Sequence, residues 1–533
     1  MNLKEAAANN PHLSRYVAEF TRKSGKAPVF YASLSKEMGD IEFINIIYPV
    51  GDPIFIHVFG AKENRKYHAI EPQLNSVEKI KYKKLLSIIL EKAIQEPVPS
   101  DDIELRQTII KLVEKNTSLN TSFSDRGQNK VQINQNEKKK VIYFIDRDII
   151  GNSILEPIIR DPYIEDVHSI GADNIFIIHK VFDLVETGIR FRDETHLSAF
   201  LRSMSERIDR PVSEAKPIVD ASMPDGSRIN IIFSNDISRR GASFTIRKFQ
   251  ETPSSIIQLI KWGTISTEIA AYLWLCLEYG MNVFVCGETA SGKTTALNAA
   301  MAFINPASKI LTAEDTAEVK PPHRVWQQLL TRESGPEESR VEMFSLLKAA
   351  LRSRPDYIIV GEIRGKEGSV AFQAMQTGHS VMATFHASSV KKMIQRFTGN
   401  PINVPVTFID NLNICIILQA VYVKGKFLRK CTAIEELVGY SQEEGGMITR
   451  AVFEWNPNTD VHIFRGLNNS YILEDKIAAK AGYLDKREIY EEMFLRARIL
   501  DEMVTRNIVE YDKVLEIISN YYSKGLDGLP FSI

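Results

Sequence analysis

The chain has 533 residues, with 66 Lys and Arg against 67 Asp and Glu, so its formal net charge is −1 at pH 7. This length predicts two or three domains that each bury a core, and the balanced charge excludes a general attraction to nucleic acid or anionic lipid. No basic and apolar signal peptide opens the sequence, and the most apolar runs, 270–276 and 413–423, are too short or too interrupted to span a bilayer. We therefore expect a soluble protein that does not insert into a membrane.

Cysteine usage is sparse and does not suggest a metal or disulfide framework. The four cysteines are Cys276, Cys286, Cys415 and Cys431. None belongs to a C-x-x-C pair, so the spacing predicts neither a zinc site nor a set of disulfides. The scarcity suits a reducing compartment.

The first 115 residues are predicted to form an α+β module. Apolar runs and turn residues predict three strands and then two helices, at 29–32, 44–48, 53–58, 77–95 and 101–114. Residues 116–140 are rich in Asn, Gln, Ser and Lys and hold few apolar side chains. Such a stretch buries too little surface to offset its ordering entropy, so we expect a flexible linker there.

Residues 141–263 are predicted to form a second α+β module. The expected elements are a hairpin, a helix and three further strands, at 175–178 and 181–189, 195–208, 217–222, 228–233 and 241–246. The last region, 264–533, alternates apolar runs with helical stretches, which predicts a parallel sheet covered by helices. Within it, residues 476–522 read as mostly amphipathic helix.

The segment 287–294 reads GETASGKT, which matches the G-x-x-x-x-G-K-[ST] pattern of a phosphate-binding loop. An apolar strand is predicted before it and a helix after it, a setting that a chance glycine-rich turn seldom has. Backbone amides can surround a β-phosphate, Lys293 can reach the β- and γ-phosphates, and Thr294 can hold Mg²⁺. The helix N-terminus adds its positive dipole end. The predicted nucleotide-binding residues are Gly287, Glu288, Thr289, Ala290, Ser291, Gly292, Lys293, Thr294 and Thr295.

Two acidic clusters follow predicted strands, at 310–318 (ILTAEDTAE) and 354–364 (RPDYIIVGEIR). Ligands of open α/β sheets bind at the carboxyl ends of the strands, so these acids are expected to face the same crevice as the loop. Glu362 suits the acid beside Mg²⁺, where it can order a metal-bound water or act as a general base. The common form of this motif has Asp where this chain has Gly361. The alternatives are an exposed acidic turn that caps a helix, and a simple pair of Glu362 with Arg364.

A third cluster, 377–387 (TGHSVMATFHA), predicts a strand flanked by His379 and His386. A neutral histidine at a sheet end can bond a phosphate or a carboxylate. A lone histidine is more often structural, but two in this ordered series favour a site.

Arginines complete the candidate site, since guanidinium suits the charge spread over a γ-phosphate. The candidates are Arg239, Arg240, Arg247, Arg332 and Arg340. All lie far from the loop in sequence, so some are expected to act across a subunit boundary. The alternative for each is a solvated surface position.

The segments GETASGKTT, ILTAEDTAE, RPDYIIVGEIR and TGHSVMATFHA resemble, in order and spacing, the Walker A, Asp box, Walker B and His box of the type II/IV secretion ATPase superfamily. In that family Gly-Glu is the usual form at Walker B. The segments DGSRINII and GASFTIRKF look like its N-terminal domain that packs over the nucleotide. The resemblance implies an α/β fold, with a RecA-like P-loop ATPase domain preceded by α+β N-terminal domains, in a hexameric motor.

Within the superfamily, EDTAEVKPPHRVWQQLLTRE and EESRVEMFSLLKAALRSRPDYIIVGEIRG resemble the archaellum (archaeal flagellum) motor ATPases. This implies hydrolysis of ATP with Mg²⁺ to power assembly, and in the archaellum rotation, of a type IV pilus-like filament. The implied partners are further copies in a homo-hexamer, a polytopic membrane platform protein and accessory cytoplasmic motor proteins. The implied location is the cytoplasm at the inner face of the cell membrane, with no nucleic-acid partner.

The resemblance also assigns roles to residues of this sequence. Lys293 and Thr294 bind phosphate and Mg²⁺, and Glu362 contributes to the Mg²⁺ site partly through water. The candidate catalytic residues are Glu314, Glu362, Arg240, Arg247, Arg332, Arg340, His379 and His386.

Other functions remain as alternatives. An archaeal adhesive-pilus ATPase or a type II-like secretion ATPase is the near alternative to the archaellum motor. A nucleic-acid translocase is less favoured, because the charge is balanced and no aromatic and basic stacking stretch is present. A scaffold that binds ATP but barely hydrolyses it is disfavoured by the two acidic strand ends.

Overall fold

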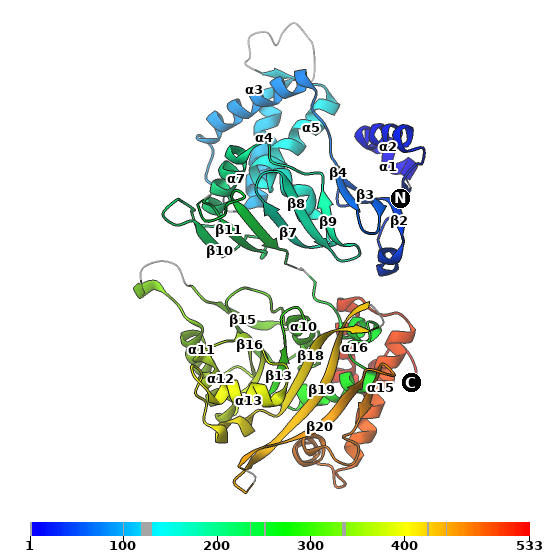
Figure 1. Cartoon of the computed structure of the whole chain (residues 1–533), viewed down its shortest axis with the longest axis vertical. Coiled ribbons are helices and arrows are strands. Elements are labelled where there is room, and N and C mark those ends of the chain that lie inside the picture. The colour runs from blue at the N-terminus through cyan, green and yellow to red at the C-terminus, as the bar shows by residue number, and fades with distance from the viewer. Residues whose placement is uncertain are drawn as a thin grey trace. The chain divides into compact units, whose positions relative to one another are not determined.

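The computed structural model describes residues 3–99, 101–118, 130–234, 236–249, 252–332, 337–423, 426–443 and 445–533. The chain divides into two compact units, Met1–Phe249 and Gln250–Ile533 (Figure 1). In these ranges, no helix combines the length and the apolar character that a membrane span needs.

A ten-stranded sheet forms the centre of the first unit, in the order β1-β2-β3-β4-β9-β8-β7-β12-β11-β10. β4 pairs with β9 in parallel, so the two modules predicted at 1–115 and 141–263 share one sheet. Buried Asp161 reinforces this union, because its Oδ2 accepts hydrogen bonds from the hydroxyls of Tyr48 (2.7 Å) and Tyr67 (3.0 Å). The strands are β1 (Val29–Phe30), β2 (Phe43–Pro49), β3 (Phe55–Ala61), β4 (Lys66–Ile70), β7 (Ile164–Ile170), β8 (Asn174–His179), β9 (Asp183–Thr187), β10 (Ile218–Ser222), β11 (Arg228–Ile232) and β12 (Ser243–Arg247).

Residues 130–140, predicted as part of a flexible linker, are folded instead. They contribute the short strand β6 and most of helix α5, which begins with a capping box between Asn134 and Glu137. The apolar side chains of this polar stretch, Val131 and Ile133, are buried against α3 and α4, which offsets its ordering entropy. The predicted linker residues 119–129 lie outside the described residues.

The helices of the first unit include the two that the sequence predicts before the linker, α3 and α4. The helices are α1 (Leu3–Asn9), α2 (Pro11–Ser24), α3 (Ser76–Ala93), α4 (Asp102–Asn116), α5 (Gln135–Ile145), α6 (Glu156–Arg160) and α7 (Glu194–Arg207), and a two-stranded sheet joins β5 (Thr117–Ser118) to β6 (Val131–Gln132).

The second unit is built on a nine-stranded sheet, in the order β15-β14-β16-β17-β13-β18-β19-β20-β21. The strands from β15 to β18 are parallel, as the sequence predicts, whereas β19, β20 and β21 add an antiparallel ribbon that it does not (Figure 1). The strands are β13 (Val283–Gly287), β14 (Lys309–Glu314), β15 (Val325–Leu330), β16 (Tyr357–Ile363), β17 (Ser380–Phe385), β18 (Ile414–Val423), β19 (Lys426–Ser441), β20 (Gly446–Asn456) and β21 (Val461–Phe464).

Side chains of the central strands alternate between two cores, one on each face of this sheet. Val283 and Val285 of β13 pack with residues of α9, α10 and α15, on what we call the α10 face. Phe284 and Cys286 pack with α11, α12 and α13, on the α12 face. The helices are α8 (Ile256–Lys261), α9 (Thr267–Glu278), α10 (Lys293–Ala300), α11 (Met343–Arg352), α12 (Glu367–Gln376), α13 (Val390–Thr398), α14 (Ala478–Ala481), α15 (Glu488–Thr505) and α16 (Tyr511–Lys524).

Helix α8 shows where the second unit begins. Its residues Ile256, Ile257 and Leu259 are buried in the same core as α9 and α10. The boundary between the units therefore falls after residue 249, rather than at the predicted 263.

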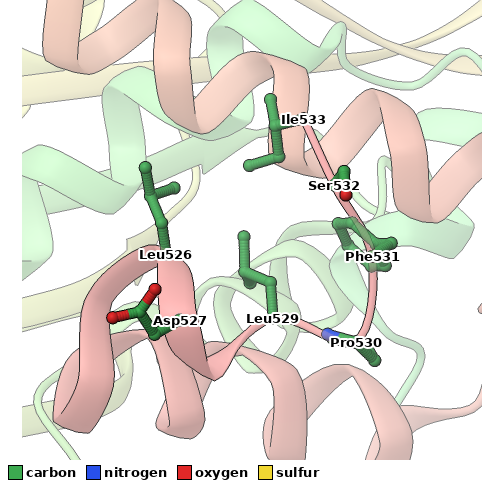
Figure 2. A pocket seen from close by; sticks show the side chains of 7 residues that line it. All are labelled: Leu526, Asp527, Leu529, Pro530, Phe531, Ser532 and Ile533. Carbon is green, nitrogen blue, oxygen red and sulfur yellow. The ribbon is translucent and has the colours of Figure 1, made fainter.

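The chain segment after α16 lines an open pocket of about 440 Å³ (Figure 2). Arg506 lies over the ring of Phe531 at 5.3 Å and holds this segment against α15. The pocket contains none of the residues predicted to bind nucleotide. Its lining residues are Leu526, Asp527, Leu529, Pro530, Phe531, Ser532 and Ile533.

Candidate active site

The predicted phosphate-binding loop joins β13 to α10, which confirms the expected strand, loop and helix. Its backbone is tight. A side chain at Gly287 would place Cβ 2.4 Å from both the Leu418 carbonyl oxygen and Ser291 Oγ, and Gly292 has φ 90°. Ala290 also takes a left-handed conformation, with φ 61°. Both glycines of the motif are therefore required by geometry, and strain of this kind clusters at functional sites.

Hydrogen-bond donors converge on one point inside the loop. Lys293 is 8% exposed, and its Nζ donates to the Glu288 carbonyl oxygen at 2.9 Å. The Ser291 amide donates to the same oxygen at 3.3 Å. Within the described residues, buried Ser291 Oγ has no hydrogen-bond partner. A phosphate oxygen can replace the Glu288 carbonyl at this point, so the loop fits an anionic phosphate chain.

The acidic segment after β14 lies on the same face as the helix that follows the loop. Alternation along β14 puts Glu314 on the side of Ile310, which is part of the core of the α10 face. Asn298 of α10 donates to the Glu318 carbonyl at 2.9 Å and accepts from the Lys320 amide at 2.8 Å. Glu314 therefore lies on the same side of the sheet as α10, the helix that follows the loop.

A bulge on β16 positions Glu362. The register of β16 against β17 shifts between Val360 and Ile363, so β16 carries one extra residue at this point. Such a bulge re-aims a side chain, here that of Glu362. A side chain at Gly361 would bring Cβ to 3.1 Å from Glu314 Cγ. Glycine at this position therefore leaves room for the Glu314 side chain.

Glu362, His386 and Lys293 form a chain of contacts that links the acidic strand end to the loop. His386 follows the carboxyl end of β17, and its Nδ1 lies 3.4 Å from Lys293 Nζ. Its Nε2 lies 2.6 Å from Glu362 Oε1, although it is not aimed along a hydrogen bond. Burial, and next the nearby Lys293 charge, lower the pKa of His386. The imidazole is therefore neutral at pH 7, with Nδ1 placed to accept from Lys293.

Arg364 holds the other side of the Glu362 carboxylate. It donates to Glu362 Oε2 at 2.5 Å and lies 3.6 Å from Asp315 Oδ2. The pair of Glu362 with Arg364 that the sequence offers as an alternative is thus present, together with the contact to His386. One guanidinium therefore joins the two acidic strand ends.

The carboxyl group of Glu314 accepts hydrogen bonds from neighbouring residues on both of its oxygens. Its Oε1 accepts from the amides of Glu318 (2.8 Å) and Val319 (2.7 Å), and its Oε2 accepts from Gln328 Nε2 at 3.1 Å. The side chain is 1% exposed, and burial raises its pKa from 4.5 to about 7. Glu314 thus fixes the acidic segment against the sheet.

This raised pKa predicts a pH dependence of stability. Between about pH 4.5 and 7, the folded protein keeps a proton on Glu314 that the unfolded chain has released, so the free energy of unfolding falls as pH rises. At about 1.4 kcal/mol for each pKa unit, this group contributes roughly 3 kcal/mol across the window. Glu314→Gln cannot titrate and is expected to remove that part of the slope. Denaturant unfolding of both proteins at several pH values measures it, and identical slopes would contradict the assignment.

The structure does not bring all predicted residues together. His379 precedes β17, and its Nδ1 lies 3.1 Å from Thr377 Oγ1. β13 and β17 are parallel, so His379 lies at the opposite edge of the sheet from the loop and His386. His379 therefore does not lie beside the loop with His386, and its role stays a prediction.

The candidate arginines fall in both units. Arg332 follows β15 at the loop edge of the second sheet, and its Nε donates to the Ser339 carbonyl at 2.7 Å. Arg340 is exposed. Arg239, Arg240 and Arg247 are exposed residues of the first unit, and their roles stay predictions.

Sequence reasoning missed one residue that touches the loop. Arg429 of β19 donates from Nε to the Ala290 carbonyl at 2.9 Å. The two residues are 139 positions apart, and no motif spacing signals the contact. Only the return of the chain along β18 and β19 brings Arg429 to the loop.

The donor set suits a Mg²⁺ ion that is held mainly by a nucleotide. Among the residues that the structure describes, no group of three or more His, Cys, Asp or Glu side chains could hold a metal ion by itself. Mg²⁺ typically keeps several waters and uses one or two protein oxygens together with substrate phosphates. Thr294, in the first turn of α10, and Glu362 fit that pattern.

A phosphate loop at one strand end and an acid at another, on a largely parallel sheet, define a P-loop protein with a RecA-like α/β domain. The family described as "Type II/IV secretion system protein" matches residues 148–450, more than half of the chain, so the protein belongs to this family. This confirms the resemblance to the type II/IV secretion superfamily.

Related proteins come from archaea and bacteria. The chain is 56% identical over 542 residues to the uncharacterized protein MJ0900 of Methanocaldococcus jannaschii, covering 100% of this chain and 98% of that protein. It is 31% identical over 232 residues to the type IV secretion system protein PtlH of Bordetella pertussis, covering 38% of this chain and 67% of PtlH. The solved ATPase DotB of Legionella pneumophila shares 18% identity at a TM-score of 0.39, covering 69% of this chain and 94% of that chain.

Proposed function

We propose that the protein is an ATPase that hydrolyses ATP with Mg²⁺ to drive a type II/IV secretion-type machine. The observation that carries this proposal is the contact chain from Lys293 through His386 to Glu362. It joins the residue that grips the phosphates to a carboxylate that can activate water. A loop that only binds nucleotide has no need of such a connection.

In this mechanism the triphosphate displaces the Glu288 carbonyl from the donors of the loop. Lys293 and the Ser291 amide then bind phosphate oxygens, which draws Lys293 Nζ away from its internal bond. Thr294 and Glu362 would hold Mg²⁺, which would supply neutralisation of the charge on the β- and γ-phosphates.

Glu362 orients the attacking water and accepts its proton. Neutral His386 lies between Glu362 and Lys293 and fixes their relative positions. Loss of the γ-phosphate removes charge-assisted bonds of about 1.5–3 kcal/mol each, enough to change a conformational equilibrium.

At a finer level, we propose a homo-hexamer that powers assembly, and rotation in the archaellum case, of a pilus-like filament. The sequence resemblance to archaellum motor ATPases supports this reading. Arginines such as Arg332 and Arg340 are then candidates to contact nucleotide bound by a neighbouring copy. The named relative PtlH is a type IV secretion system protein, so a secretion or adhesive-pilus ATPase is the alternative.

Removal of the metal tests the enzymatic step. Phosphate release from ATP by the purified protein is expected to fall to background in excess chelator, because charge on the phosphates is no longer neutralised. Release is expected to return when Mg²⁺ is added in excess. Metal-independent release would contradict the proposed chemistry, and strong stimulation by DNA with steep salt dependence would favour a translocase.

Gene deletion tests the finer level. Loss of swimming filaments with adhesive pili retained is the result expected of an archaellum motor. The reverse phenotype would assign the protein to pilus assembly. The mass of the protein with bound nucleotide, measured by light scattering, is expected to be that of six chains.

A further inference from the structure

The strands β18 and β19 continue well past the phosphate-binding loop. Gly287, the last residue of β13, pairs with Leu418, yet β18 runs on to Val423 and pairs throughout with β19. At about 3.3 Å for each residue, this extension reaches roughly 16 Å beyond the end of β13. We call it the β18–β19 arm, and Figure 1 shows both strands.

One side of the arm continues the α10 face. Leu418 and Cys431, which pair across the two strands, are both buried in the core of that face. Alternation then places the next same-side pairs, Ala420 with Arg429 and Tyr422 with Phe427, on the same side. The bond from Arg429 to the Ala290 carbonyl shows that this side meets the loop.

The site fixes the direction in which a bound nucleotide lies. Glu362 and His386 come from β16 and β17, which are on one side of β13 in the sheet order. The γ-phosphate must lie toward these residues if Glu362 is to activate water. The nucleoside therefore extends toward the other side of β13, where β18 and β19 lie.

The arm offers the chemistry that a base needs. Tyr422 is 77% exposed and Phe427 is 46% exposed, with their ring centroids 5.4 Å apart. The guanidinium of Arg429 lies 5.4 Å from the Phe427 ring centroid. Exposed aromatic rings and a planar guanidinium stack on the faces of nucleobases, whichever base is present.

We propose that Phe427, Tyr422 and Arg429 form the subsite for the nucleoside of the bound nucleotide. This inference rests on the proposed binding of ATP by the loop. Arg429 has a second effect, as a positioning residue. A peptide group is planar and trans, so the bond that directs the Ala290 carbonyl outward turns the Ser291 amide inward, toward the phosphate position.

The test compares ligands with and without a nucleoside. Calorimetry measures Kd for ATP, GTP and inorganic tripolyphosphate with the full chain. Phe427→Ala is expected to weaken ATP binding about 10-fold through loss of stacking, and to leave tripolyphosphate binding unchanged. Phe427→Tyr keeps a ring and is expected to keep the affinity. Phe494→Ala, at a phenylalanine of similar exposure (39%) on α15, is the matched control.

Arg429 predicts a different pattern. Arg429→Ala is expected to weaken both ATP and tripolyphosphate, because it loosens the loop itself, and to weaken ATP more, because the base also loses a stacking partner. The proposed subsite is overturned if the double variant Phe427→Ala, Tyr422→Ala binds ATP with unchanged affinity and keeps its melting temperature. If the unaltered chain binds neither ATP nor tripolyphosphate, the proposed function itself is overturned.

Discussion

Lys293→Ala is expected to abolish measurable ATP turnover and to weaken nucleotide binding severely. The ammonium group is nearly buried and already donates into the loop, so a phosphate chain finds it in place without further ordering. Removal of one such preorganised donor from a reacting oxyanion typically costs about 10²–10³ in rate. The loss here is expected at the upper end, because Lys293 also holds His386 through its Nδ1. Phosphate release and nucleotide titration measure the two effects.

A lysine elsewhere in the same unit supplies the control. Lys348 lies on α11 with its ammonium 4.3 Å from the Phe344 ring centroid, and it has no role in the loop. Lys348→Ala is expected to keep wild-type turnover. Wild-type turnover in Lys293→Ala would remove the loop from the proposed chemistry altogether.

The sequence predicts those parts of the site that depend on local geometry. A strand, a glycine-bracketed turn and a helix are fixed by neighbouring residues, and the loop at 287–294 forms as expected. Parallel strands share one carboxyl edge, so the positions of Glu314 and Glu362 follow once both runs are recognised as strands. The bulge that re-aims Glu362 is consistent with Gly361 but is not predicted by it.

Parts of the site that depend on pairing between strands far apart in the chain are not predicted from the sequence. The arm that brings Arg429 to Ala290 depends on an antiparallel return that no turn motif announces. For His379, closeness in sequence is misleading. Strand β17 lies between His379 and His386, so the two histidines are at opposite ends of that strand. Composition also misjudges 130–140, where a few well-placed apolar residues suffice for burial.

Glu362→Gln is expected to bind ATP with near wild-type affinity but to hydrolyse it about 10²–10⁴ times more slowly. The substitution keeps the size of the side chain and one oxygen, which can still accept the hydrogen bond from Arg364. It removes the carboxylate that accepts a proton from water. Single-turnover phosphate release and equilibrium titration separate these effects, because the first is expected to collapse while the second holds.

A nearby glutamate distinguishes this chemistry from simple loss of charge. Glu367 begins α12 and accepts hydrogen bonds from the amides of Arg364 and Gly365 at 2.6 Å each. Glu367→Gln makes the same chemical change in the same segment while keeping an oxygen for those amides, and it is expected to retain turnover. Equal loss in both variants would mean that the segment acts through its fold or its charge. Loss confined to Glu362→Gln would identify that carboxylate as the group that activates water, because only this side chain is joined through His386 to the lysine of the loop.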